Sequence, residues 1–265
     1  MLHLLKIEWM KLKNYRTFWV LSILYLISIF AANFVVYSIQ ERIFRDKQAG
    51  GMAEMMLGPR PYSFPLNWQM TTYVSSFLLF IPGLLIIMIV TNEYNYRTHR
   101  QNIIDGLSRK QFISVKMVMT LIMAVLSTLI VFLTAVSFGL LQKEAFSTTN
   151  IQYVGYYFLQ ALSYGMFALL LGVIFKRAGL ALGIFFLYSL VIENFMGGIL
   201  NYFTKTYGRY LPLESVDSLI PFPLLKEMQG MVVQPIHYPS LLVTAAIYLF
   251  LYYFVSNRKF TTDDL

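Results

Sequence analysis

Six long apolar runs constrain this chain more than any other feature of its sequence. A helix needs about 20 mainly apolar residues to cross the hydrocarbon of a bilayer. Backbone N–H and C=O groups find no water there, so each run must satisfy them internally as a helix. The sequence therefore predicts an all-α integral membrane protein, a single transmembrane domain over residues 1–265. The six predicted transmembrane helices cover residues 17–38, 71–91, 115–141, 153–175, 179–201 and 239–256.

The composition supports burial in a membrane. Charged residues make up 13% of the chain and hydrophobic residues 57%, whereas soluble domains carry roughly 25% charged residues. The net charge is +8, but the cations lie in short loops between apolar runs and form no continuous basic face, so no nucleic-acid partner is expected. The chain has no cysteine, which excludes disulfides, thiolate nucleophiles and zinc–thiolate sites. The first apolar run is too long for the core of a signal peptide, and no small-residue cleavage site follows it, so we expect it to remain as the first span.

The distribution of Lys and Arg predicts the orientation. Most of the 21 basic residues fall in segments that lie on the same side as the N-terminus, many of them close to the ends of the spans. Cytoplasmic loops are enriched in Lys and Arg, so both termini are predicted to be cytoplasmic. Lys116, the one cation inside a predicted span, lies close to the membrane boundary.

Three features interrupt the plain pattern of spans. Residues 1–14 place Leu2, Leu5, Trp9 and Leu12 on one helical face, which is typical of a helix lying in the membrane interface. Such a helix either leads into the first span and has a role of its own, or it only anchors the chain at the membrane surface. Pro82 and Gly83 are expected to kink the second span. The prolines of residues 202–238 indicate short outer helices between the fifth and sixth spans.

The stretch that joins the second and third spans carries two signals for the start of a helix. Thr98 with Gln101, and Ser108 with Gln111, are each spaced as a capping box. Gly106 lies between them, where a glycine in the left-handed conformation ends a helix. The spacing predicts a short helix of about two turns before the third span begins.

This predicted helix, residues 98–105, is too short to be stable in water by itself. It must pack against something, and two capping boxes exceed what a loop that only sets topology requires. A rigid knob that docks onto a partner protein is the favoured interpretation, and a solvated basic loop is the alternative. The apolar contacts on offer are Ile103, Ile104 and Leu107, and the polar ones are Arg97, Arg100, Asn102 and Asp105.

The residues Asn92-Glu93-Tyr94, Arg97-Thr98 and Gly106-Leu-Ser-Arg109, together with six spans and an interfacial N-terminal helix, resemble the membrane subunits of type 2 ABC exporters. The resemblance implies that the loop is a coupling helix seated in a groove of an ATP-binding subunit. Arg97 departs from the pattern, because many members carry glycine at this position. The residues that the resemblance assigns to ATPase coupling are Glu93, Arg97, Thr98, Arg100, Gln101, Asn102, Ile103, Ile104, Asp105, Gly106, Leu107, Ser108 and Arg109.

The resemblance also implies the assembly. Two permease copies, identical or different, would sit in the lipid of the inner membrane with two ATPase subunits and form a substrate path between them. ATP and Mg would be bound by the ATPase subunits, because this chain contains no P-loop sequence. It also lacks the common hydrolase and dinucleotide-binding motifs, and its three histidines are scattered, so neither a catalytic centre nor a metal site is expected.

Glu193, with Asn194 beside it, is the candidate for a polar group in the substrate pathway. A carboxylate deep in a span costs several kcal/mol unless it is paired or hydrated. It could contact the substrate or act as a protonatable gate, or it could make an interhelical hydrogen bond or face the outer vestibule. An ion-coupled carrier that uses Glu193 and a scaffold without transport activity are alternative functions. The sequence does not identify the substrate.

Overall fold

The computed structural model describes residues 2–46, 50–51, 60–104, 106–142, 145–223 and 236–262. Within these ranges every regular element is helical. The elements are α1 (Leu2–Lys13), α2 (Arg16–Arg45), α4 (Asn67–Ser76), α5 (Phe80–Asn95), α6 (Thr98–Ile104), α7 (Arg109–Leu141), α8 (Gln152–Phe175), α9 (Ala178–Phe186), the π-helical segment η1 (Leu187–Ile192), α10 (Glu193–Thr204), the 3-10 turn η2 (Tyr207–Tyr210), α11 (Glu214–Asp217) and α13 (Tyr238–Thr262).

Five of the described segments are long and apolar enough to cross a membrane, and a sixth is a bent pair. The five are α2, α7, α8, the continuous α9–η1–α10 helix and α13, while α4 and α5 meet at an angle of 45°. These segments correspond to the six predicted spans. They extend beyond most of the predicted limits, because the helices include polar residues that flank the apolar runs.

The bend in the second span was predicted at the wrong place. The break falls at residues 77–79, and α5 then begins at Phe80, which places Pro82 in its first turn. Proline is tolerated there because the first N–H groups of a helix have no partner within it. Gly83 serves close packing, since a Cβ atom at this position would lie 2.5 Å from the ring of Phe185 on α9.

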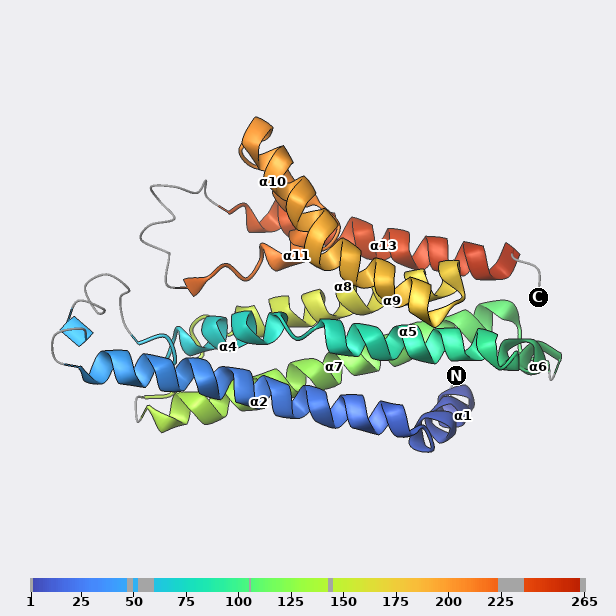
Figure 1. The fold of residues 1–265 in the computed structure, drawn as a ribbon, viewed down its shortest axis with the longest axis horizontal. Coiled ribbons are helices and arrows are strands. Elements are labelled where there is room, and N and C mark those ends of the chain that lie inside the picture. Colours follow the sequence, from blue (N-terminus) through green and yellow to red (C-terminus); the bar gives the residue numbers. More distant parts are fainter. Residues whose placement is uncertain are drawn as a thin grey trace.

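The spans form an elongated bundle in which α8 is central (Figure 1). Of the apolar window of α8, 61% is buried within the chain, against 17% for both α2 and the α9–η1–α10 helix. The core includes Leu169, Ile87 and Phe185, all fully buried. Figure 1 shows α10 leaning away from the bundle, and its large side chains Phe195, Tyr202 and Phe203 are exposed.

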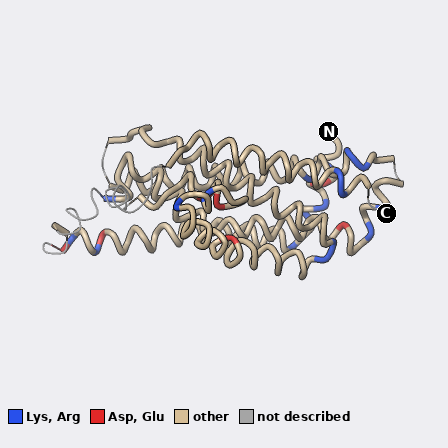
Figure 2. Tube along the Cα trace, turned by 90° about the horizontal axis from the view of Figure 1, so that it is seen from above, with Lys and Arg blue, Asp and Glu red and all other residues tan. Residues whose placement is uncertain are grey.

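Both ends of the chain and α6 lie at the same end of the bundle (Figure 1). Figure 2 shows Lys and Arg concentrated at that end. The structure thus places both termini and α6 at one end of the bundle, and the side of the membrane on which this end lies stays a prediction.

The segment after α10 is built partly from short helices, as its prolines predicted. The turn η2 packs against α10, and α11 packs between α8 and α13. The rest of the predicted outer loop, residues 224–235, lies outside the described residues. The position of α11 brings its carboxyl groups against the bundle.

Candidate functional site: a short helix, a charge cluster and a cavity beside α11

Four charged side chains meet where α1, α5 and α7 converge, and we call Glu8, Lys11, Glu93 and Lys116 the charge cluster. The Nζ atom of Lys11 lies 2.9 Å from a carboxylate oxygen of Glu8 and 2.9 Å from one of Glu93. The Nζ atom of Lys116 lies 2.9 Å from Glu93 and also pairs with Glu8. The cluster therefore joins three helices through two cations and two carboxylates.

Because the charge cluster is buried, each of its four side chains needs the others to balance its charge. The side chain of Lys116 is 2% exposed, and those of Glu8 and Glu93 are 8% and 6% exposed. Burial lowers the pKa of Lys11, but the charges of Glu93 and Glu8 outweigh it, so the pKa is raised above the ordinary value. A buried charge without its partner costs several kcal/mol, so separating α1, α5 and α7 at the charge cluster would be strongly unfavourable.

The short helix α6 is attached to this cluster through Glu93. The hydroxyl of Thr98 donates to the Glu93 carboxylate. Nδ1 of His99 lies 2.8 Å from the Glu93 carbonyl oxygen in a hydrogen bond. Because Glu93 also pairs with Lys11 and Lys116, contacts through this one side chain link α6 to α1, α5 and α7.

The backbone around α6 follows the sequence signals with one difference. Ser108 and Gln111 form the predicted capping box at the start of α7, and Gly106 has a φ of +99°. The hydroxyl of Thr98, in contrast, bonds to Glu93 rather than capping its own helix. Arg97 has a φ of +55°, so it takes the left-handed conformation for which glycine is the usual residue.

The predicted coupling residues divide between the surface and the interior. Ile104 is 77% exposed, and Arg97, Arg100 and Gln101 are exposed beside it. Ile103 and Leu107 instead pack against the core of the chain itself, and Asn102 is half-buried. The guanidinium of Arg109 donates to the Thr261 carbonyl oxygen at 2.8 Å. Asp105 lies outside the described residues.

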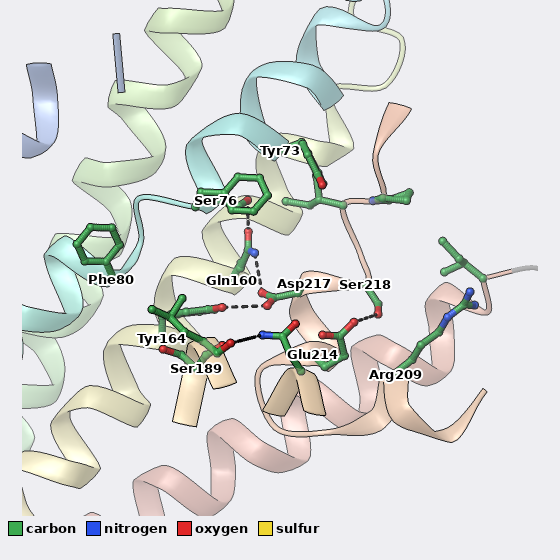
Figure 3. Close-up of a pocket in the computed structure, with 16 residues that line it drawn as sticks. Tyr73, Ser76, Phe80, Gln160, Tyr164, Ser189, Arg209, Glu214, Asp217 and Ser218 are labelled. Atoms are coloured by element: carbon green, nitrogen blue, oxygen red, sulfur yellow. Dashed lines mark hydrogen bonds between the residues drawn. The ribbon is translucent and has the colours of Figure 1, made fainter. Parts of the chain in front are cut away.

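Away from α6, a cavity of about 380 Å³ opens beside α11, and we call it the α11 cavity (Figure 3). Asp217 on α11 accepts hydrogen bonds from Nε2 of Gln160 at 2.7 Å and from the hydroxyl of Tyr164 at 2.9 Å. Ser76, the last residue of α4, donates to Oε1 of Gln160 at 2.7 Å. This chain of hydrogen bonds connects the break between α4 and α5 to α8 and α11.

The two predicted pathway residues differ in position. Glu193 is buried, and one of its carboxylate oxygens accepts hydrogen bonds from the backbone N–H groups of Leu213, at 2.6 Å, and Glu214, at 3.0 Å. It therefore holds the start of α11 in place. Asn194 lines the α11 cavity, and its side-chain amide donates to the carbonyl oxygens of Ser189 and Leu190.

Sequence reasoning missed Glu8, Lys11 and Asp217 as candidates. Lys116 carried a usable signal, because a cation at the end of an apolar run requires a carboxylate nearby. Among the described residues, no group of three or more His, Asp or Glu side chains is placed to hold a metal ion.

Residues 4–193 match the family model described as ABC-2 family transporter protein. The chain belongs to this family. The match includes α1, the charge cluster, α6 and the first five membrane-spanning segments up to Glu193. No curated protein matches the sequence. The chain is thus a multi-pass membrane permease subunit of an ABC transporter, and members of this family are transport subunits without catalytic activity of their own.

Proposed function

We propose that this permease subunit serves an ATP-driven exporter and that α6 is the coupling helix that docks on a separate ATPase subunit. The observation that carries the proposal is the attachment of α6 to the charge cluster through Glu93. A helix of seven residues is bonded to Glu93 at the end of the bundle that carries both termini.

The surface of α6 supports docking. Ile104 is 77% exposed, at the end of the molecule where Lys and Arg concentrate (Figure 2). An exposed isoleucine between exposed polar side chains suits a groove with an apolar floor and a polar rim, which is typical of protein interfaces. Ile103 and Leu107 face the core, so we assign the groove contact to Ile104 and the charge contacts to Arg97 and Arg100.

The charge cluster supplies the route for the motion. Closure of ATPase subunits would shift α6, and Thr98 and Glu93 would pass the shift to α5, α7 and α1. ATP can bias an inward-facing equilibrium toward the outward-facing state only if it binds the two states unequally. The attachment of α6 through buried charges supports a rigid-body response, because the cluster resists local rearrangement.

The outer surfaces of the bundle support assembly with a second permease. The helices α2 and α9–η1–α10 bury only 17% of their apolar windows within the chain, so lipid or another subunit covers the remainder. We infer a complex of two permeases and two ATPase subunits in the inner membrane, with both termini and α6 on the cytoplasmic side. ATP and Mg are bound by the ATPase subunits.

The test substitutes the exposed apolar side chain of α6. Ile104→Asp should leave the permease inserted and folded but abolish its co-purification with the ATPase subunit, because a charge would enter the apolar groove. Phe203→Asp is the matched control, since Phe203 is also 77% exposed but lies at the far end of α10. Full retention of the ATPase by Ile104→Asp would contradict the docking assignment.

A further inference from the structure

The α11 cavity combines the carboxyl groups of Asp217 and Glu214 with aromatic walls, and Arg209 also lines it. Asp217 lies in the cavity with the rings of Tyr73, Phe77, Phe80 and Tyr164 (Figure 3). The volume of about 380 Å³ falls within the roughly 300–1,000 Å³ typical of small-molecule sites. Aromatic faces and a carboxylate together are the groups that recognise organic ammonium ions.

Three carboxyl groups lie close together beside this cavity, but their partners differ. Glu193 accepts two backbone N–H groups. Glu214 accepts from the hydroxyl of Ser218 at 3.2 Å, and the charge of Arg209 stabilises its ionised form. Asp217 accepts only from the uncharged Gln160 and Tyr164 among the residues that the structure describes. It is thus the carboxyl group whose charge is left for a ligand to balance.

The position of the cavity relates it to the bend of the second span. Ser76, Phe77 and Phe80 flank the 45° break between α4 and α5, and all three line the cavity. Because α5 continues to Glu93 and the charge cluster, a ligand beside the break would contact the same span that α6 moves. The cavity is therefore placed to sense or to follow the motion of that span.

We propose that the α11 cavity binds an organic ammonium cation, with Asp217 as the counter-ion and Tyr73, Phe77 and Phe80 around the apolar part of the ligand. Gln160 and Tyr164 orient the carboxylate through their hydrogen bonds, and Ser76 orients Gln160. The proposal deepens the proposed function, on which it rests, by naming the class of cargo that the pathway accepts.

Proton binding at Asp217 competes with the cation. Burial, followed by the charge of Glu214, raises the pKa of Asp217 to about 8, with Glu193 adding to the rise and Gln160 and Tyr164 opposing it. Burial also raises the pKa of Glu214. The other groups facing this region are Arg209 on η2, Tyr73 on α4 and Tyr248 on α13, of types that ordinarily titrate near 10 or above. Cation binding should therefore strengthen from pH 6 to pH 8.

The experiment measures binding of benzyltrimethylammonium, whose charge does not change with pH, to the full-length permease in lipid nanodiscs by calorimetry. We expect saturable binding that strengthens on the order of 50-fold between pH 6 and pH 8, the factor set by the ionised fraction of a group with a pKa of about 8. Asp217→Asn should weaken binding at pH 8 at least tenfold and remove most of the pH dependence.

Two further variants separate the site from the fold. Phe77→Ala, at a side chain that is 66% exposed, should weaken binding about three- to tenfold through the lost ring contact. Glu41→Gln is the control for charge removal, since Glu41 bonds to Gln142 and Arg60 and does not line the cavity; it should bind as the wild type does. Equal binding by the wild type and Asp217→Asn, or no saturable binding at pH 8, would overturn the proposal.

The outcome can be separated from that of the docking test. Absence of cation binding, with the ATPase lost from Ile104→Asp, would overturn the cavity assignment alone. Cation binding by the wild type, with the ATPase retained by Ile104→Asp, would overturn the coupling assignment and leave the binding site established.

Discussion

The two polar regions of this molecule use carboxyl groups in opposite ways. In the charge cluster, Glu8 and Glu93 share two lysines at short distances, and nothing is left for a ligand to balance. In the α11 cavity, Asp217 has uncharged partners among the described residues and faces open space. Carboxylates paired with lysines fix three helices to one another, whereas a carboxyl group that is hydrogen-bonded only to uncharged described residues beside a cavity is available to a ligand, as we propose for Asp217.

The largest expected effect on stability comes from removing one cation of the charge cluster. Lys116→Met should lower the free energy of unfolding by about 3–5 kcal/mol, because it leaves Glu8 and Glu93 buried with only Lys11 to balance them. Thermal unfolding in detergent measures the change. Lys110→Met, at an exposed lysine one helix turn or more from Lys116, should have little effect, and equal destabilisation by both variants would contradict the account of the cluster.

In the α11 cavity, the contribution of Asp217 to the stability of the fold should depend on pH. The pKa of Asp217 is raised, mainly by burial, from 3.8 to about 8, so the folded chain holds a proton that the unfolded chain releases. The associated stability is fully present below pH 3.8 and is lost as the pH rises to about 8. Asp217→Asn should therefore gain stability relative to the wild type between pH 5 and pH 9.

Melting curves of the wild type and of Asp217→Asn between pH 5 and pH 9 test whether the variant becomes more stable relative to the wild type as the pH rises. Glu41→Gln should keep the slope of the wild type. If the difference in melting temperature between Asp217→Asn and the wild type stays constant from pH 5 to pH 9, the carboxyl group is not held protonated by its surroundings.

A smaller effect is expected where α6 joins the cluster. Thr98→Val removes the hydrogen bond to the Glu93 carboxylate, and a bond to a charged group contributes about 1.5–3 kcal/mol. Hydrogen exchange should become faster in residues 98–104 and stay unchanged in α8. Thr128→Val is the control, because the hydroxyl of Thr128 bonds to the Ala124 carbonyl oxygen of its own helix; similar exchange in both variants would mean that Thr98 does not secure α6.

The smallest effect concerns the left-handed residue before α6. Arg97→Gly should stabilise the fold by about 1 kcal/mol, since glycine takes a positive φ without the steric cost of a side chain. It should also weaken ATPase docking if Arg97 makes the proposed charge contact. Arg100→Gly, within α6, should destabilise by a similar amount. A loss of stability in Arg97→Gly would show that the arginine side chain supports the turn.

The sequence predicted the features that depend on local spacing. Six apolar runs gave the membrane-spanning segments, Ser108 with Gln111 gave the start of α7, and Gly106 gave the end of α6. Each of these follows from residues within a few positions of one another. The bend at residues 77–79 was placed at Pro82 instead, because a proline early in a helix and one inside it look alike in sequence.

The features that depend on distant contacts could not be predicted. Glu8 and Lys116 are 108 residues apart in the chain, and nothing in the pattern of apolar runs specifies that they meet. The division of Ile103 and Ile104 between core and surface depends on how α6 is rotated against α5 and α7. Asp217 depends likewise on distant contacts, because α11 packs against α8 and Gln160 of α8 links Asp217 to Ser76 beside the break between α4 and α5.

The most direct test of the coupling assignment uses the absence of cysteine from the chain. Ile104→Cys and Phe203→Cys place single thiols on α6 and near the last residue of α10, for labelling with a membrane-impermeant maleimide in right-side-out and inverted membrane vesicles. We predict that Ile104→Cys reacts only in inverted vesicles and is protected when the ATPase subunit is bound, while Phe203→Cys reacts only in right-side-out vesicles. Labelling of Ile104→Cys from the outside, or unchanged labelling with the ATPase bound, would contradict the account.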